Sequence, residues 1–155
     1  MAFKQWSACT FILCLGLASA GAVATLARPI VKPQTPPQVQ FVTAEELKGK
    51  FVRNEPVTVL DVRSSSDFGE NENKIKGAIH VKVRKLHARL ALPPLKNVPR
   101  DSEVVTYCAC PNDEASIRAA QELTNAGFKR VRVLKGGWVA WKKTNGQIES
   151  RPRGL

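Results

Sequence analysis

Short apolar runs rich in β-branched residues recur along the chain after residue 41. They occupy residues 57–60, 78–81, 104–107 and 131–134. Runs of this length and composition are typical of strands that are buried on both faces of a sheet. We therefore predict a strand over each of these four ranges.

Helical patterns separate the predicted strands. Residues 43–46 (TAEE) match a capping box, in which a threonine precedes a glutamate by three positions, and this predicts a short helix over 44–50. Residues 117–126 carry an apolar stripe with helical spacing that ends before Gly127, a residue type that commonly terminates helices. Strands that alternate with helices predict a doubly wound α/β fold, with a mainly parallel sheet and helices on both of its faces.

The first part of the chain follows a different pattern. Residues 5–27 contain no charged side chain, and residues 8–27 are continuously apolar or small. The sequence ASA at 18–20 has the form that signal peptidase accepts, and the same stretch is also long enough to cross a bilayer. We interpret residues 1–27 as a signal peptide or an N-terminal membrane anchor. The rest of the chain is then exported to the periplasm or cell envelope, or held at the membrane by this segment.

Proline and charge divide the rest of the chain. Residues 28–40 contain four prolines, which favour an extended linker. We assign residues 41–145 to one folded domain, because a chain of 155 residues has room for a single core once its N-terminal part is set aside. Residues 146–155 are interpreted as a basic tail.

The chain is strongly basic. It has 24 lysine and arginine residues against 13 aspartate and glutamate residues, which gives a formal net charge of +11. Part of this charge is clustered at residues 82–89, 129–135 and 142–143. An exported domain does not meet nucleic acid, so we expect no nucleic-acid partner. The charge instead favours solubility, membrane association through anionic lipids, or attraction of small anions.

Two of the four cysteines lie in a loop between a predicted strand and a predicted helix. The other two, Cys9 and Cys14, lie in the apolar N-terminal segment and are interpreted as small apolar residues. Backbone N–H groups of a loop and of a helix start stabilise anions and thiolates, so this loop is the candidate active site. Its residues are Cys108, Ala109, Cys110, Pro111, Asn112, Asp113, Glu114, Ala115 and Ser116. A single C-x-C pair lacks the second ligand pair of a typical zinc site, so we predict no metal.

Several motifs together carry a family resemblance. They are LDVR at 60–63, DF at 67–68, IKGAIH at 75–80, VTYC at 105–108, and LKGGW at 134–138 followed by Trp141. Through these motifs the chain resembles a single rhodanese-like domain over residues 41–143. The resemblance implies about five mainly parallel strands and a sulfurtransferase or persulfide carrier that needs no cofactor. Its catalytic cysteine would take sulfane sulfur from a small anionic donor of the thiosulfate type and pass it to a thiol or another nucleophilic acceptor. The resemblance gives Asp61 and Arg63 a supporting structural role as an ion pair.

The length of the loop leaves two candidates for the catalytic cysteine. Common members of the rhodanese-like family have a serine six positions after the catalytic cysteine. Here Ser116 stands eight positions after Cys108 and six after Cys110. Counting from the strand therefore selects Cys108, and counting from the helix selects Cys110. We predict Cys108 as the nucleophile because the preceding strand fixes its position, with Cys110 as the alternative.

Acidic residues distinguish this loop from those of related enzymes. Asp113 and Glu114 lie in a loop that needs arginine in the related phosphatases and arsenate reductases, and Arg118 is too far along the helix to be assigned that role. Acids are favourable at the first turn of a helix, but they also repel anionic donors. Two alternative functions therefore stay open. One is a thiol–disulfide redox protein that uses the Cys108/Cys110 pair, whose tight ring should be readily reduced. The other is a catalytically inactive rhodanese-like binding module.

Overall fold

The computed structural model describes residues 38–70 and 73–150. The predicted signal peptide or membrane anchor at 1–27 and most of the predicted linker lie outside the described residues. Within the two described ranges, no helix has the length and apolar character needed to cross a membrane.

Strands and helices alternate along the described residues. The strands are β1 (Gln40–Val42), β2 (Thr58–Asp61), β3 (Asn73–Ile75), β4 (Ile79–His80), β5 (Glu103–Tyr107), β6 (Arg130–Leu134) and β7 (Ile148–Ser150). The α-helices are α1 (Ala44–Val52), α2 (Ser65–Glu70), α3 (Leu86–Arg89), α4 (Glu114–Asn125) and α5 (Gly137–Lys143). Short 3₁₀ helices are η1 (Val83–Lys85), η2 (Leu95–Asn97) and η3 (Pro111–Asp113). The four predicted strands are confirmed to within one residue at each end.

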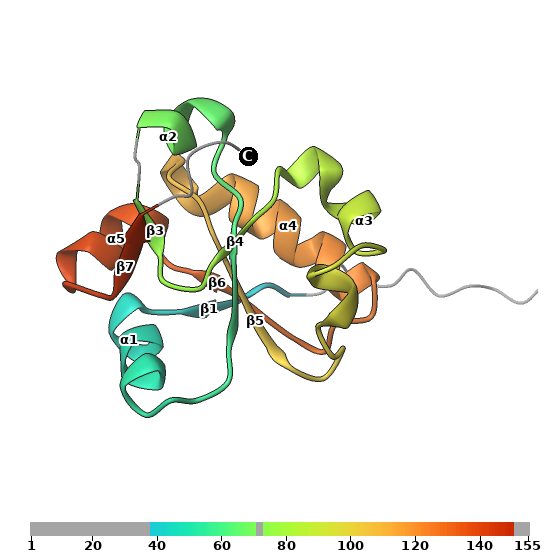
Figure 1. Cartoon of the computed structure of the whole chain (residues 1–155), viewed down its shortest axis with the longest axis horizontal. Coiled ribbons are helices and arrows are strands. Elements are labelled where there is room, and N and C mark those ends of the chain that lie inside the picture. Colours follow the sequence, from blue (N-terminus) through green and yellow to red (C-terminus); the bar gives the residue numbers. More distant parts are fainter. Residues whose placement is uncertain (1–37, 71–72, 151–155) are drawn as a thin grey trace, which may run out of the picture. The chain divides into compact units, whose positions relative to one another are not determined.

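Five strands form one parallel sheet in the order β1-β6-β5-β2-β4 (Figure 1). All residues of the central strand β5 are buried. The predicted doubly wound α/β fold with a parallel sheet is confirmed. The apolar pattern did not indicate β1, because this edge strand has three residues and two of them are exposed. Its pairing with β6 is what makes it a strand.

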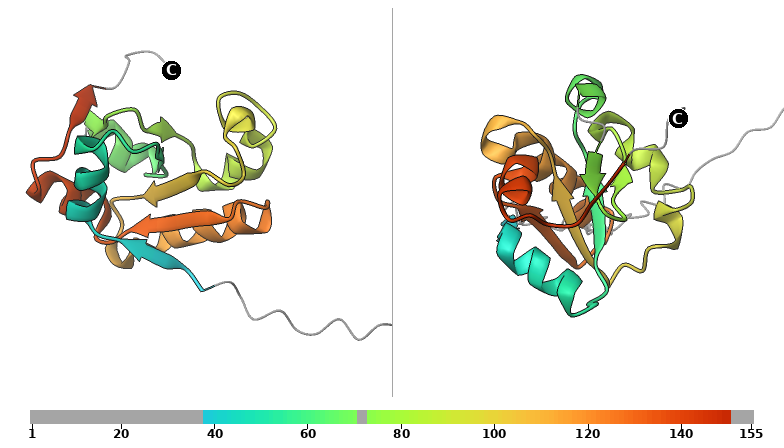
Figure 2. Two further views of the ribbon diagram at one scale, coloured as in Figure 1. Left: turned by 90° about the horizontal axis from the view of Figure 1, so that it is seen from below. Right: turned by 60° about the vertical axis from the view of Figure 1, so that its left-hand side comes forward.

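Helices cover both faces of this sheet (Figures 1 and 2). On one face α1 and α5 pack against each other over an apolar group that includes Leu47 and Trp141. On the other face α3 and α4 cover a second group that includes Leu86 and Leu123. Alternate residues of β5 belong to the two groups, because successive side chains of a strand point to opposite faces.

The predicted capping box fixes the start of α1. The Glu46 N–H donates to Thr43 Oγ1 at 3.1 Å, and the Thr43 N–H donates to Glu46 Oε2 at 2.8 Å. These two bonds satisfy N–H groups that a helix start would otherwise leave without partners. The helix follows β1 directly and continues two residues past its predicted end, to Val52.

A second sheet joins two segments that are far apart in the sequence. β3 pairs antiparallel with β7, with Ile75 opposite Ile148, and Lys74 forms an ion pair with Glu149 at 2.5 Å. The apolar pattern predicted neither of these short strands. Residues 148–150, which fall within the predicted basic tail, therefore pair with the domain. This pairing holds β3 next to the end of β5, where the Ile75 N–H donates to the Tyr107 hydroxyl at 3.3 Å.

Candidate active site

The carboxyl ends of the parallel strands meet at one edge of the sheet, which is where such sheets bind ligands. Asp61 ends β2, Cys108 follows β5 and Gly136 follows β6. These strands are neighbours in the sheet, so the three residues lie at the same edge. The structure therefore brings the cysteine loop, the Asp61 motif and the glycine pair together.

Backbone contacts fix Cys108 at the start of the loop. Its carbonyl oxygen accepts a hydrogen bond from the Trp138 N–H at 2.8 Å. A Cβ at Gly137 would collide with that same oxygen, and Gly137 also has a positive φ of 48°. Glycine is required here because only glycine combines this conformation with so close an approach. The GGW sequence thus holds the cysteine loop against the start of α5.

Asp113 attaches the middle of the loop to the same turn. Its Oδ2 accepts a hydrogen bond from the Gly136 N–H at 2.8 Å, and the residue is buried. Asn112 and Asp113 both have positive φ values, 59° and 57°. Two consecutive residues in the left-handed conformation thus accommodate the extra length of the loop. Asp113 is the N-cap residue of α4 by position, but its side chain makes no capping bond. Its side chain therefore does not cap α4, because its carboxylate bonds to the turn after β6 instead.

The two cysteines of the loop are joined as a disulfide, with their Cα atoms 5.6 Å apart. Their surroundings differ. Cys108 is 1% exposed and belongs to the apolar group under α3 and α4, whereas Cys110 is half-buried at the edge of that group. The Ala115 N–H, in the first turn of α4, donates to Cys110 Sγ at 3.5 Å. The helix start is therefore directed at Cys110.

A pocket of about 390 Å³ opens beside the cysteines. Both cysteines and Ala115 line it, together with residues that follow β2 and β4. Its charged lining residues are Arg63, Lys82, Arg84, Arg118 and Asp67. Asp61 balances the charge of Arg63, which leaves three cations, Lys82, Arg84 and Arg118, against one acid, so the pocket suits a small anion.

Sequence reasoning missed most of this cationic lining. Arg118 was not assigned the role of the phosphatase arginine, and the sequence did not indicate that it borders the pocket, one turn from the start of α4 at Glu114. Lys82 and Arg84 belong to a basic cluster that the sequence showed, without any sign that it faces the cysteines. The β4–α3 connection brings them there, and only the fold reveals that placement.

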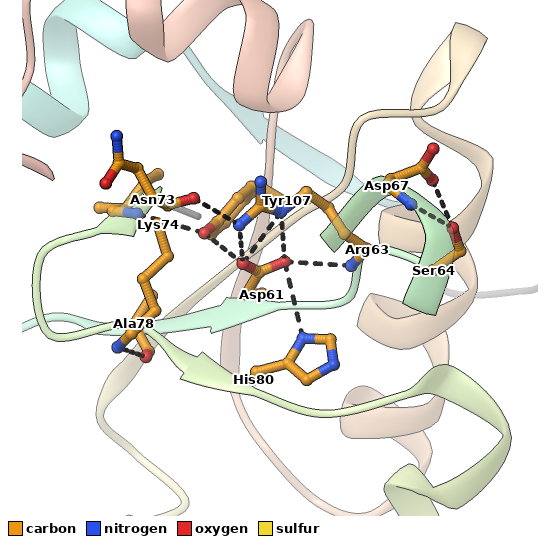
Figure 3. Close-up of polar contacts among 10 residues, drawn as sticks. Asp61, Arg63, Ser64, Asp67, Asn73, Lys74, Ala78, His80 and Tyr107 are labelled. Atoms are coloured by element: carbon orange, nitrogen blue, oxygen red, sulfur yellow. Dashed lines mark hydrogen bonds and ion pairs between the residues drawn. The ribbon is translucent and has the colours of Figure 1, made fainter. Parts of the chain in front are cut away.

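Behind the pocket, Asp61 and Arg63 form a fully buried ion pair (Figure 3). Arg63 Nη2 lies 2.6 Å from Asp61 Oδ2, and Arg63 Nε lies 3.0 Å from both carboxylate oxygens. The Tyr107 hydroxyl donates to Asp61 Oδ2 at 2.7 Å, and Arg63 Nη2 also donates to the Asn73 carbonyl at 2.9 Å. The Arg63 guanidinium lies 4.6 Å from the ring centroid of Trp138. This network connects β2, β3, β5 and α5 behind the cysteine loop.

The network also sets the charge state of its members. Burial alone would raise the pKa of Asp61, but the polar contacts of His80, Arg63 and Tyr107 outweigh it and hold that pKa below its ordinary value. Burial, and then the neighbouring negative charge of Asp61, raise the pKa of Tyr107 far above its ordinary value. Asp61 is therefore ionised and Tyr107 neutral at pH 7. Such charge states suit an ion-paired support and do not suit proton transfer.

The described part of the chain contains no group of three or more His, Cys, Asp or Glu side chains arranged to hold a metal ion. Besides Asp67 and two serines, the pocket lining includes the two cysteines, the cationic side chains and Ala115, whose N–H at the start of α4 donates to Cys110 Sγ. This set can bind an anion beside a thiol and can stabilise a thiolate.

Comparison with known proteins identifies the family. The family model of the rhodanese-like domain matches residues 43–144. The chain therefore belongs to the rhodanese-like domain family, as its motifs indicated.

Curated relatives include sulfurtransferases. A sulfurtransferase of Allochromatium vinosum is 26% identical over 105 residues, which cover 68% of this chain and 90% of the relative. The thiosulfate sulfurtransferase GlpE of Coxiella burnetii is 29% identical, over 68% of this chain and 86% of the relative. Among solved structures, the Alr3790 protein of Anabaena sp. matches with a TM-score of 0.60 and 33% identity, over 70% of this chain and 81% of that one. The parallel sheet and the rhodanese-like fold are thereby established.

Proposed function

We propose that this protein is a sulfurtransferase that carries sulfane sulfur as a persulfide on a cysteine of the 108–116 loop. The observation that carries the proposal is the pocket, in which both loop cysteines lie beside Lys82, Arg84 and Arg118. A thiol next to a cationic anion site is what a thiosulfate-type donor needs. Membership of a family that includes sulfurtransferases supports the same chemistry.

The proposed reaction has two transfers. A loop thiolate attacks the outer sulfur of thiosulfate, the S–S bond of the donor breaks, and sulfite leaves with the bonding electrons. A thiol or another nucleophile then attacks the outer sulfur of the persulfide, and the cysteine thiolate is the leaving group. The cationic side chains would hold the dianion, and the N–H groups at the start of α4 would stabilise the thiolate. Neither transfer uses a metal or an organic cofactor.

The acidic residues of the loop do not oppose this reaction as strongly as the sequence indicated. Asp113 directs its carboxylate to the Gly136 N–H, so part of its charge is compensated by the backbone. Glu114 is exposed, where water and salt screen its charge. The pocket lining itself holds only Asp67 as an acid among its described residues.

A mass measurement on the full chain tests the proposal. The reduced protein, kept in mild detergent because of its apolar N-terminal segment, is incubated with thiosulfate and then digested with trypsin. Cleavage after Arg100 and Arg118 releases peptide 101–118, which contains both loop cysteines and neither Cys9 nor Cys14. We expect the mass of this peptide to change and sulfite to appear in solution. A Cys108→Ser/Cys110→Ser double variant is the control and should release no sulfite.

The disulfide favours a second candidate function, which is thiol–disulfide exchange without sulfane sulfur. Such a redox protein would yield no sulfite from thiosulfate, but it would lose both loop thiols on mild oxidation and regain them with a dithiol reductant. A binding module without catalysis would respond to neither treatment. Sulfite measurement and thiol counting on peptide 101–118 therefore separate the three functions.

A further inference from the structure

We infer that the two loop cysteines have different tasks: Cys110 accepts the sulfur, and Cys108 then resolves the persulfide and releases hydrogen sulfide. This inference rests on the proposed function, because it requires a persulfide to form first. It goes beyond that function because it assigns both sulfur atoms and names the product. The protein would then reduce sulfane sulfur to sulfide instead of only carrying it.

Three observations assign the first step to Cys110. Cys110 is half-buried, whereas Cys108 is 1% exposed, so a donor in the pocket reaches Cys110 more easily. The Ala115 N–H donates to Cys110 Sγ at 3.5 Å, and α4 is a helix of 12 residues, so its dipole favours a thiolate at this position. Apart from the disulfide, the contact of Cys108 Sγ among the described residues is a distant one, to the Cys110 carbonyl oxygen at 4.0 Å, and a carbonyl oxygen does not stabilise a thiolate.

The disulfide assigns the second step to Cys108. The loop backbone brings Cys108 Sγ into bonding contact with Cys110 Sγ, which is the inner sulfur of a persulfide formed on Cys110. Burial keeps acceptors in solution away from Cys108 but leaves it beside this inner sulfur. The disulfide therefore shows that the loop can bring the attacking sulfur to this inner sulfur. This placement is also why the long loop carries a second thiol.

The step balances without an added oxidant. The Cys108 thiolate attacks Cys110 Sγ, the bond between that atom and the outer sulfur breaks, and the outer sulfur leaves as HS⁻. One S–S bond forms and one breaks; the sulfane sulfur gains two electrons, and the two cysteines lose two. The resulting Cys108–Cys110 disulfide must be reduced by an external dithiol before the next cycle. Thiosulfate and a dithiol are thus consumed, and sulfite, sulfide and a disulfide are formed.

The test is a single turnover of the reduced full chain with excess thiosulfate and no other thiol. We expect the wild type to release sulfite and an equal amount of sulfide, and peptide 101–118 to lose two hydrogen atoms without gaining sulfur. Cys108→Ser and Cys108→Ala should release sulfite but no sulfide, and their peptide should keep one added sulfur atom. Cys110→Ser should release neither product. A Cys9→Ser/Cys14→Ser double variant should behave as the wild type.

Each other result has a definite meaning. Sulfite without sulfide from the wild type, with an added sulfur on the peptide, overturns the resolving step but leaves the proposed function intact. Normal persulfide formation in Cys110→Ser overturns the assignment of the two tasks. The absence of sulfite from every protein overturns the proposed function itself. The wild-type masses alone distinguish the first and last of these results, so those two conclusions do not depend on whether a variant folds.

Discussion

Replacing Arg63 by methionine tests the buried network behind the loop. Methionine keeps much of the volume and the apolar contact with Trp138, but it removes three short contacts to the Asp61 carboxylate and one to the Asn73 carbonyl. Both side chains of the pair are 0% exposed, so water cannot replace the lost partner. Removing one member of a buried ion pair typically costs about 3–5 kcal/mol of unfolding free energy. A domain of this size should then lose roughly 10 °C or more in Tm.

The assay is urea unfolding followed by circular dichroism at pH 7, on the full chain. Arg53→Met is the matched control, because Arg53 pairs with Glu55 in solvent and is 61% exposed, and its loss should change the midpoint little. The double variant Asp61→Asn/Arg63→Met should be more stable than Arg63→Met, because it leaves no unpaired buried charge. Equal midpoints for Arg63→Met and Arg53→Met would show that the buried ion pair contributes no more to stability than the exposed one.

The dependence on pH has a defined sign. The pKa of Asp61 is lowered in the folded wild type, so the stability from this network is present above the ordinary pKa of aspartate and is lost as pH falls through the lowered value. In Arg63→Met the pKa of Asp61 should be higher than in the wild type, because a contact that lowers it is lost while burial, which raises it, remains. A larger fraction of Asp61 is then neutral in mild acid, where less buried charge is left without its partner. The stability difference from wild type should therefore be smaller at pH about 4 than at pH 7.

Three further predictions concern the loop, the pocket and the network. Gly137→Ala should destabilise the protein by about 2 kcal/mol or more in urea unfolding, and clearly more than Gly77→Ala. Both glycines have positive φ, but only the new Cβ at Gly137 meets the Cys108 carbonyl. Equal losses of stability in the two variants would exclude this collision. Lys82→Gln should raise the KM for thiosulfate roughly three- to fivefold and weaken the dependence of KM on salt. Lys85→Gln, which is outside the pocket lining, should do neither. Kinetics of both variants at low and high salt test this difference. Tyr107→Phe should cost about 1–3 kcal/mol, because it removes a buried donor to Asp61 and an acceptor for the Ile75 N–H; a neutral result in thermal unfolding would mean that the hydroxyl contributes nothing.

The parts of the site that follow directly from strand ends could be predicted from the sequence. A buried strand has a strong apolar pattern, so the residues after β2 and β5 were identified, and Asp61 and Cys108 with them. The glycine pair was visible as well, although the sequence did not show that Gly137 meets the Cys108 carbonyl. That contact joins residues far apart in the chain, and spacing within one segment contains no information about it.

The role of Asp113 shows the same limit within the loop. A local rule assigned this acid to the helix start, because acids near the first turn are generally favourable. In the folded chain its carboxylate accepts a hydrogen bond from the Gly136 N–H, which is far away in the sequence, and makes no bond to the helix start. The short strands β1, β3 and β7 showed no apolar pattern for a similar reason. Each is stabilised by pairing with its partner strand and not by a long apolar run of its own.

The amino-acid sequence was sufficient to predict the class of fold, the buried strands, the capping box of α1 and the loop that carries the candidate chemistry. These features depend on local periodicity and on residue types at fixed spacings, which the chain displays directly. Only the folded chain shows which cations line the pocket, which cysteine meets the start of α4 and which cysteine is buried beside it. Those relations depend on how the loops after β2, β4, β5 and β6 converge at one edge of the sheet, and that convergence is a property of the packed chain.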